Sequence, residues 1–357
     1  MRGLAVLLVF GGHFAATWFP GALFALDVLF VLSGYFVTRL LLLERERYGA
    51  LDLRVFYVRR ALRVLPALFV VVAVLTCLAV LLPPRVPSAG PVVSAAWSCS
   101  YMANWFAGVR FPSGAGYLAH TWTISVEEQF YFLGPAALIL FCRRGRAQVG
   151  LIRWALLLAV ASIASRTALF VLGQPSYAFY FTPARLDGLM LGAATAIALA
   201  DPGLATRLHT LCGRATGAAL LLLGAGAVVG PRDLLGFTWW RLLPGVTAAG
   251  LLTVVVVIGL QATPHSATSR VLSGGPLATV GRASYCLYLV HFPVALVLIA
   301  ETGYGPVGRL VVGLPATAAL GALLHLVVER PALRLRARLP AATRRPAPAP
   351  HRSTAMH

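Results

Sequence analysis

The chain has 357 residues, of which 59% are apolar, and its mean hydropathy is +0.81. Soluble domains are roughly half apolar, so this excess, gathered in long runs, excludes an ordinary soluble protein and predicts a membrane protein. The net charge of +19 comes from arginine without any lysine. Because the arginines lie between the apolar runs, where they suit anionic lipid headgroups, we expect a lipid bilayer and no nucleic acid as partner.

The cysteines show no spacing that is typical of a structural framework. They are scattered singly, without a C-x-x-C motif or a regular Cys/His spacing, at Cys77, Cys99, Cys142, Cys212 and Cys286. We therefore predict neither a disulfide framework nor a metal site, and no bound cofactor.

The apolar runs predict an all-α, polytopic membrane protein with about ten transmembrane helices. A spanning helix needs about 20 apolar residues. The membrane domain is expected to cover residues 1–334, followed by a disordered, basic, Pro/Ala-rich tail at 335–357. The predicted spans are 3–19, 21–43, 64–82, 121–141, 151–172, 183–200, 214–230, 243–260, 277–299 and 307–328.

Arginine asymmetry predicts the topology. The connections after the second and fourth spans and the C-terminal tail are rich in arginine, whereas the connection before the fourth span holds only Arg85 and Arg110. By the positive-inside rule both termini are cytoplasmic. The all-arginine usage is typical of a GC-rich bacterial genome, so we expect a bacterial inner membrane. The long external segment 83–120 is a candidate lid or acceptor-binding loop.

Ionisable side chains inside membrane spans are costly, and by default they mark a functional site. His13 follows Arg2 by eleven positions, which places it about 16 Å deeper along a helix axis. An imidazole can take a proton from a hydroxyl nucleophile and return one to a leaving thiolate. A histidine that is merely hydrogen-bonded to a neighbouring helix is the alternative.

The second and third spans hold further candidates. Asp27 interrupts the second span, where a buried ion pair or a helix-terminal role is as open as a chemical role. Ser33 and Gly34 suit close helix packing. Arg60 and Arg63, in FYVRRALRVLP, share a helix face and can bind phosphate groups bidentately. Charge that only fixes the topology is the alternative for both arginines.

The fourth span begins with HTWTISVEEQFYFLGP. The spacing of His120, Glu127 and Tyr131 predicts that one helix face presents an imidazole, a carboxylate and a phenol together. The adjacent carboxylates of Glu127 and Glu128 are hard to explain by packing alone in a membrane span.

Charges also lie in the fifth and sixth spans, at Arg166, Arg185 and Asp187. We predict a compensating charge network between these side chains and a glutamate of the fourth span.

The last two spans carry a polar stripe and a polar end. In GRASYCLYLVHFPV, Ser284, Tyr288 and His291 share one stripe, for which a packed aromatic stripe is the alternative. At the closing HLVVERP, we expect Glu329 to anchor the helix at the inner interface and His325 to reach toward the membrane surface. A ligand role is the alternative for His325.

Together these motifs resemble the acyltransferase-3 family of integral-membrane O-acyltransferases from Arg2 to about Arg334. RGLAVLLVFGGH resembles the family's Arg-x10-His signature, LDVLFVLSGYFVT its second-helix pattern, and FYVRRALRVLP its Arg-rich entry to the third helix. HTWTISVEEQFYFLGP, TPARLDGLMLG, GRASYCLYLVHFPV and the closing ERP then follow in the family's order.

The resemblance implies that acyl-CoA, approached from the cytoplasm, donates an acetyl or short-chain acyl group to a hydroxyl of a carbohydrate or glycosylated small molecule. Arg2 and His13 match the family's essential pair, with His13 the acid/base, and Arg60 and Arg63 match its donor-phosphate motif. Glu127 joins the catalytic set. Supporting or acceptor-side roles are expected for Asp27, His120, Glu128, Arg185, Asp187, Tyr288 and His291.

Many relatives carry a fused extracytoplasmic domain, which is not evident here, so both a polysaccharide and a small glycoside are open as acceptor. Direct attack on the thioester is favoured over an acyl-enzyme on Ser33 or Ser125, because neither serine has a paired base at local spacing. A proton-coupled lipid or sugar transporter is the alternative function, since intramembrane His, Glu and Arg also form proton relays. Release of coenzyme A would distinguish an acyltransferase from a transporter.

Overall fold

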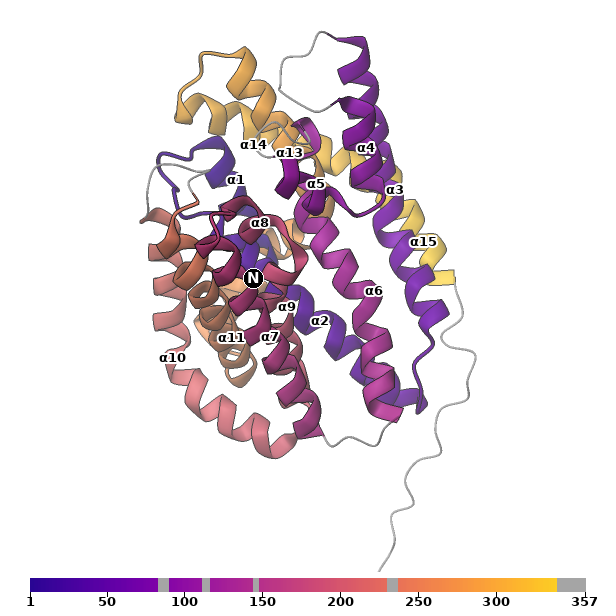
Figure 1. Ribbon diagram of the computed structural model, residues 1–357, viewed down its shortest axis with the longest axis vertical. Coiled ribbons are helices and arrows are strands. Elements are labelled where there is room, and N and C mark those ends of the chain that lie inside the picture. Colours follow the sequence, from indigo (N-terminus) through magenta and orange to yellow (C-terminus); the bar gives the residue numbers. More distant parts are fainter. Residues whose placement is uncertain (83–89, 111–115, 144–147, 230–236, 339–357) are drawn as a thin grey trace, which may run out of the picture.

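The computed structural model describes residues 1–82, 90–110, 116–143, 148–229 and 237–338. Within these ranges the protein forms helices and no strand, which confirms the predicted all-α class (Figure 1). The longer helices are α1 (Arg2–Phe14), α2 (Phe24–Tyr48), α3 (Leu53–Leu81), α6 (Thr121–Arg143), α7 (Gln148–Val171), α9 (Thr182–Ala198), α10 (Pro202–Val228), α11 (Val246–Ala262), α13 (Gly275–Glu301) and α14 (Pro306–Leu324).

Short helices and turns join them. Two of the turns are π-helical and continue directly into an α-helix, namely η2 into α11 and η3 into α15. The short elements are α4 (Pro91–Cys99), α5 (Ala103–Arg110), η1 (Gly116–Leu118), α8 (Pro175–Tyr180), η2 (Arg241–Gly245), α12 (Ala267–Ser273), η3 (His325–Glu329) and α15 (Arg330–Arg338).

Each predicted span coincides with a helix, although not every one is long. Among the described residues, seven helices are long and apolar enough to cross a bilayer: α2, α3, α7, α10, η2 with α11, α13, and α14 through α15. Helix α1 is shorter. The count of ten crossings and the cytoplasmic termini remain predictions.

Two helix boundaries and one connection differ from the expected ones. Helix α1 ends at Phe14, because Ala15 leaves the helical conformation and turns follow, so His13 lies in its last turn. The described part of 83–120 forms α4, α5 and η1, which pack on α3, α6 and α8. Helix α15 continues to Arg338, past the boundary expected at 334, and the remainder of the predicted tail lies outside the described residues.

Glycines set the closest helix contacts. A Cβ on Gly34 of α2 would lie 2.0 Å from the Leu189 carbonyl oxygen of α9, and a Cβ on Gly192 would lie 2.1 Å from that of Val31. The two backbones are therefore in direct contact, as small residues permit, which confirms the packing role predicted for Gly34. A Cβ on Gly3 would likewise lie 2.3 Å from a carbonyl oxygen of α13, so α1 lies directly against α13.

Particular helix ends lie together at each end of the bundle. Figure 1 shows the end of α2, the start of α3 and the end of α6 at the bottom of the bundle, with α4 at the opposite end. Helices α2 and α6, which precede the two arginine-rich connections, thus end at the same end of the bundle, as the arginine pattern requires.

Candidate functional site

Three histidines from separate parts of the chain meet inside the bundle. His13 lies in the last turn of α1, His291 lies on α13, and His120 directly precedes α6. The ring centroid of His291 lies 5.1 Å from that of His13 and 5.7 Å from that of His120. His120 and His291 are buried, while His13 is half-buried. All three were candidates from the sequence, and the structure brings them together.

Hydrogen bonds define which nitrogen of His13 can act as a base. His291 Nδ1 donates to the Tyr288 carbonyl oxygen at 2.5 Å, which leaves the Nε2 of a neutral His291 as an acceptor. His13 Nδ1 lies 3.0 Å from the Val9 carbonyl oxygen and 3.3 Å from His291 Nε2, so it carries the proton and donates. His13 Nε2 therefore keeps its lone pair, as a general base requires.

A cavity of about 270 Å³ lies between α1, α2, α3, α6, α13 and α15. Tyr288 lines it, and the Tyr288 ring centroid lies 5.0 Å from that of His291, so Tyr288 connects the cavity to the three histidines. His13 itself does not line the cavity. Its lining includes five arginines, Arg2, Arg59, Arg60, Arg63 and Arg336.

Arg60 is held in place from two sides. Its Nε donates to Glu128 Oε2 at 2.8 Å, its Nη2 contacts the other carboxylate oxygen, and its guanidinium lies 3.3 Å from the Tyr131 ring centroid. Such a bidentate pair is rigid and already satisfied. Arg2 and Arg63, in contrast, have no ion-pair partner among the described residues. They are therefore the better placed of the predicted arginines to bind phosphate.

Glu127 pairs with a serine on another helix. Ser33 Oγ of α2 donates to Glu127 Oε1 at 2.8 Å, and both side chains line the cavity. Tyr131, one turn further along α6, lines it too, whereas His120 lies outside it beside Tyr288. The predicted common face of α6 thus holds for the carboxylate and the phenol but not for the imidazole. Ser33 also has the carboxylate partner that local spacing did not indicate.

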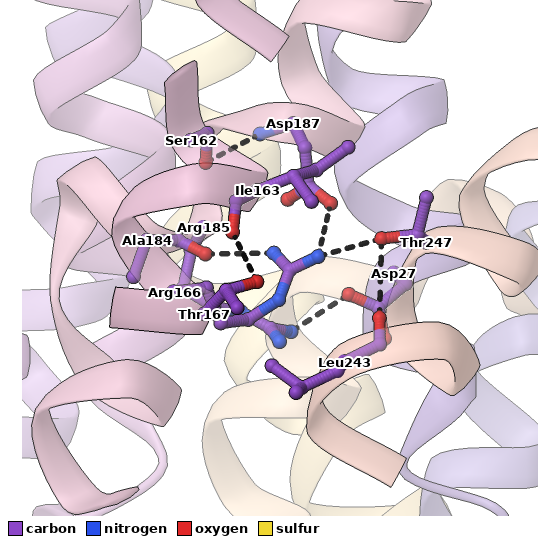
Figure 2. A network of polar contacts seen from close by, with 10 residues as sticks. All are labelled: Asp27, Ser162, Ile163, Arg166, Thr167, Ala184, Arg185, Asp187, Leu243 and Thr247. Atoms are coloured by element: carbon purple, nitrogen blue, oxygen red, sulfur yellow. Dashed lines mark hydrogen bonds and ion pairs between the residues drawn. The ribbon is translucent and has the colours of Figure 1, made fainter. Parts of the chain in front are cut away.

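The predicted charge network exists with a different member (Figure 2). Arg166 Nη2 pairs with Asp187 Oδ2 at 2.9 Å, and Arg185 Nη2 pairs with Asp27 Oδ1 at 2.7 Å. Arg166 also donates to Thr247 Oγ1 at 2.7 Å. The expected glutamate of α6 is absent from these pairs because Glu127 and Glu128 face the cavity.

The position of this charge network indicates a structural role. The four charged residues are at most 4% exposed and join α2, α7 and α9, with none of them lining the cavity. The Arg185 guanidinium also lies 5.3 to 5.6 Å from the ring centroids of Phe30, Trp122 and Phe179. Asp27, Arg185 and Asp187 therefore hold the bundle together behind the site.

Sequence reasoning missed two arginines of the cavity. Arg59 lies in the predicted Arg-rich entry to the third span but had no binding role, and Arg336 lies in the predicted tail. The signal for Arg336 is the amphipathic pattern of α15, whose arginines fall on a helix that packs against α3.

Comparison with known proteins confirms the family resemblance. A sequence profile described as an acyltransferase domain, that of the acyltransferase-3 family, matches residues 1–326. The peptidoglycan O-acetyltransferase OatA of Listeria monocytogenes is 29% identical over 348 residues, which cover 93% of this chain and 54% of that protein. The putative peptidoglycan O-acetyltransferase YrhL of Bacillus subtilis is 29% identical, with the same shares of both chains.

The O-acetyltransferase OatA of Staphylococcus aureus is 27% identical, over 93% of this chain and 56% of that protein. The chain thus spans just over half the length of these relatives, and no solved structure matches it. The chain belongs to the acyltransferase-3 family. It is a multi-pass protein of the bacterial cytoplasmic membrane, and the comparisons give no support to a transporter.

Proposed function

We propose that the chain transfers an acetyl group from acyl-CoA directly to a hydroxyl of a peptidoglycan sugar, with His13 as the general base. The observation that carries the proposal is the histidine cluster. In it, His13 Nδ1 is hydrogen-bonded to His291, which leaves Nε2 its lone pair, and Tyr288 connects the cluster to an arginine-lined cavity. The relatives named as peptidoglycan O-acetyltransferases support the acceptor and the acyl group.

The arginines support a polyanionic donor. Acyl-CoA carries its phosphates on the nucleotide and its thioester at the far end of an extended pantetheine arm. Arg2, Arg63 and Arg336 would bind the phosphates, while the arm lies along the cavity toward Tyr288. The thioester then reaches the histidine cluster without the nucleotide entering the bundle.

In the proposed reaction, His13 Nε2 removes the proton of the acceptor hydroxyl as its oxygen attacks the thioester carbon. The C–S bond breaks, and the His13 imidazolium returns its proton to the departing thiolate, so coenzyme A leaves as the free thiol. His291 Nε2 accepts from His13 Nδ1–H and so stabilises the imidazolium.

The purified chain, given acetyl-CoA and soluble peptidoglycan fragments, tests this function. We expect coenzyme A release that depends on the fragments, together with fragments heavier by one acetyl group in mass spectra. Release that is equal without fragments would indicate a hydrolase and overturn the proposal. An acetyl adduct on the protein after donor alone would replace direct transfer by an acyl-enzyme, for which Ser33 beside Glu127 is the first candidate.

Replacing Arg63 by alanine should weaken donor binding on the order of tenfold at low salt, because one charge-assisted phosphate contact is lost. The difference from wild type should shrink at high salt, since exposed phosphate contacts are screened. Titration calorimetry with coenzyme A measures the effect, and Arg54→Ala, on the exposed side of the same helix, is the matched control. An unchanged affinity would leave Arg63 with only a topological role.

His291 should act as a positioning residue. Its replacement by alanine frees the His13 ring, so kcat is expected to fall on the order of 10²-fold. KM for the donor should stay unchanged because His291 does not line the cavity. His291→Gln, whose amide oxygen can accept the same proton, should restore part of the rate. A rise in KM at constant kcat would contradict this role.

A further inference from the structure

A second cluster of polar side chains lies where α13 meets the end of α14. Cys286 of α13 is fully buried, and Glu329, the last residue of η3, is 2% exposed. Cys286 Sγ lies 3.0 Å from Glu329 Oε2, and His325 Nδ1 lies 2.6 Å from the same oxygen. The three ligand-type atoms all lie within 4.8 Å of one another.

This cluster corrects two sequence expectations. Glu329 is not an interfacial anchor, because it is buried between a thiol and an imidazole, and His325 turns inward to Glu329. No spacing motif announces the cluster, since Cys286 and Glu329 lie 43 positions apart. A π-helical turn positions His325 and Glu329, and such turns are frequent at functional sites.

We propose that Cys286, His325 and Glu329 bind one zinc ion. Thiolate, imidazole and carboxylate are the side chains that bind zinc, and three protein ligands leave a fourth position for water. A thiolate, a carboxylate and a neutral imidazole carry two negative charges, which Zn²⁺ neutralises, so the loaded site adds no net charge to a buried region.

The geometry needs only a small adjustment. Zinc bonds of about 2.3 Å to sulfur and 2.0–2.2 Å to nitrogen and oxygen place neighbouring ligand atoms roughly 3.3–3.6 Å apart. Glu329 Oε2, now 3.0 Å from Cys286 Sγ and 2.6 Å from His325 Nδ1, must therefore move away from both atoms by a few tenths of an ångström to about one ångström. His325 can provide its share of this movement and an entry path, because its side chain is 28% exposed. Cys286 Sγ and Glu329 Oε2, which are buried, must move apart by small rotations of their side chains.

The site would join α13 to α15 next to the donor cavity. Ser284 and Tyr285, which directly precede Cys286, line the cavity, and α15 begins directly after Glu329 and carries Arg336 into it. Zinc would thus fix the helix that presents Arg336. It has a structural role and takes no part in the transfer step, so the proposal stands independently of the proposed function.

Metal analysis of the full chain, purified without chelator and reconstituted with one equivalent of zinc, tests the site. We expect one zinc per chain. Cobalt(II), substituted for zinc, should show a thiolate-to-cobalt charge-transfer band. Cys286→Ser should abolish the band, and His325→Ala should weaken metal affinity at least tenfold. Cys212→Ser, a half-buried cysteine outside the cluster, should change neither readout.

The wild-type chain alone can overturn the proposal, so the test does not depend on the folding of any variant. Absence of retained zinc together with absence of the cobalt band would leave the cluster as a hydrogen-bonded triad. A band that persists in Cys286→Ser would assign the metal to another cysteine and would equally overturn it.

Discussion

Replacing His13 by alanine is expected to lower the rate of acyl transfer by about 10²–10⁴-fold, the usual contribution of a positioned general base. The protein should still insert and fold, because His13 is half-buried at the end of α1 and makes one backbone hydrogen bond within its own helix. Donor binding should persist, since the arginines of the cavity are untouched.

The measurement is coenzyme A release by the purified variant, with folding checked by its thermal unfolding curve. His265→Ala, which removes an exposed histidine in the connection after α11, is the matched control and should retain the wild-type rate. Wild-type turnover by the His13 variant would remove His13 from the chemistry.

The second large effect that we expect is a loss of free energy of unfolding when Asp27 is replaced. Asp27→Ala leaves the Arg185 guanidinium buried and unpaired, so the free energy of unfolding should fall by about 3–5 kcal/mol. Denaturant unfolding in detergent measures it. Asp52→Ala, which removes the side-chain cap of α3, is the control and should cost only about 1 kcal/mol.

A double variant separates the ion pair from simple packing. Asp27→Leu combined with Arg185→Met removes both charges, and it should recover most of the stability that Asp27→Ala loses. An Asp27→Ala protein as stable as the wild type would show that this buried pair does not hold α2 to α9.

The helices were predictable because the length of an apolar run is a local property of the sequence. The residues at which the helices end were less predictable. Helix α1 stops at Phe14 within a run that continues beyond it, because its packing against α13 and the turns before α2 decide the boundary. Helix α15 continues past Arg334 because it packs along α3, a contact that lies far away in the sequence.

The candidate residues were predictable from the cost of polar groups in a membrane and from the family resemblance, but their partners were not. Gly34 and Gly192 bring the backbones of α2 and α9 together, so Asp27 reaches Arg185. The α6 glutamates face the cavity and meet Arg60 and Ser33 instead. Pairing between helices follows from how they pack, which local spacing cannot give.

We expect donor and acceptor to reach His13 from opposite faces of the membrane. Arginine asymmetry assigns the arginine-rich ends to the cytoplasm, so the phosphate-binding arginines would face that side. The bilayer core is about 30 Å thick, so the pantetheine arm must carry the thioester inward to His13.

The direct test uses vesicles that contain the chain in one orientation, with acetyl-CoA supplied only on the cytoplasmic face and peptidoglycan fragments only on the other. We expect acetylated fragments on the far side and free coenzyme A on the near side, and both should be lost in His13→Ala. Transfer that occurs only when both substrates are on the same face would contradict it.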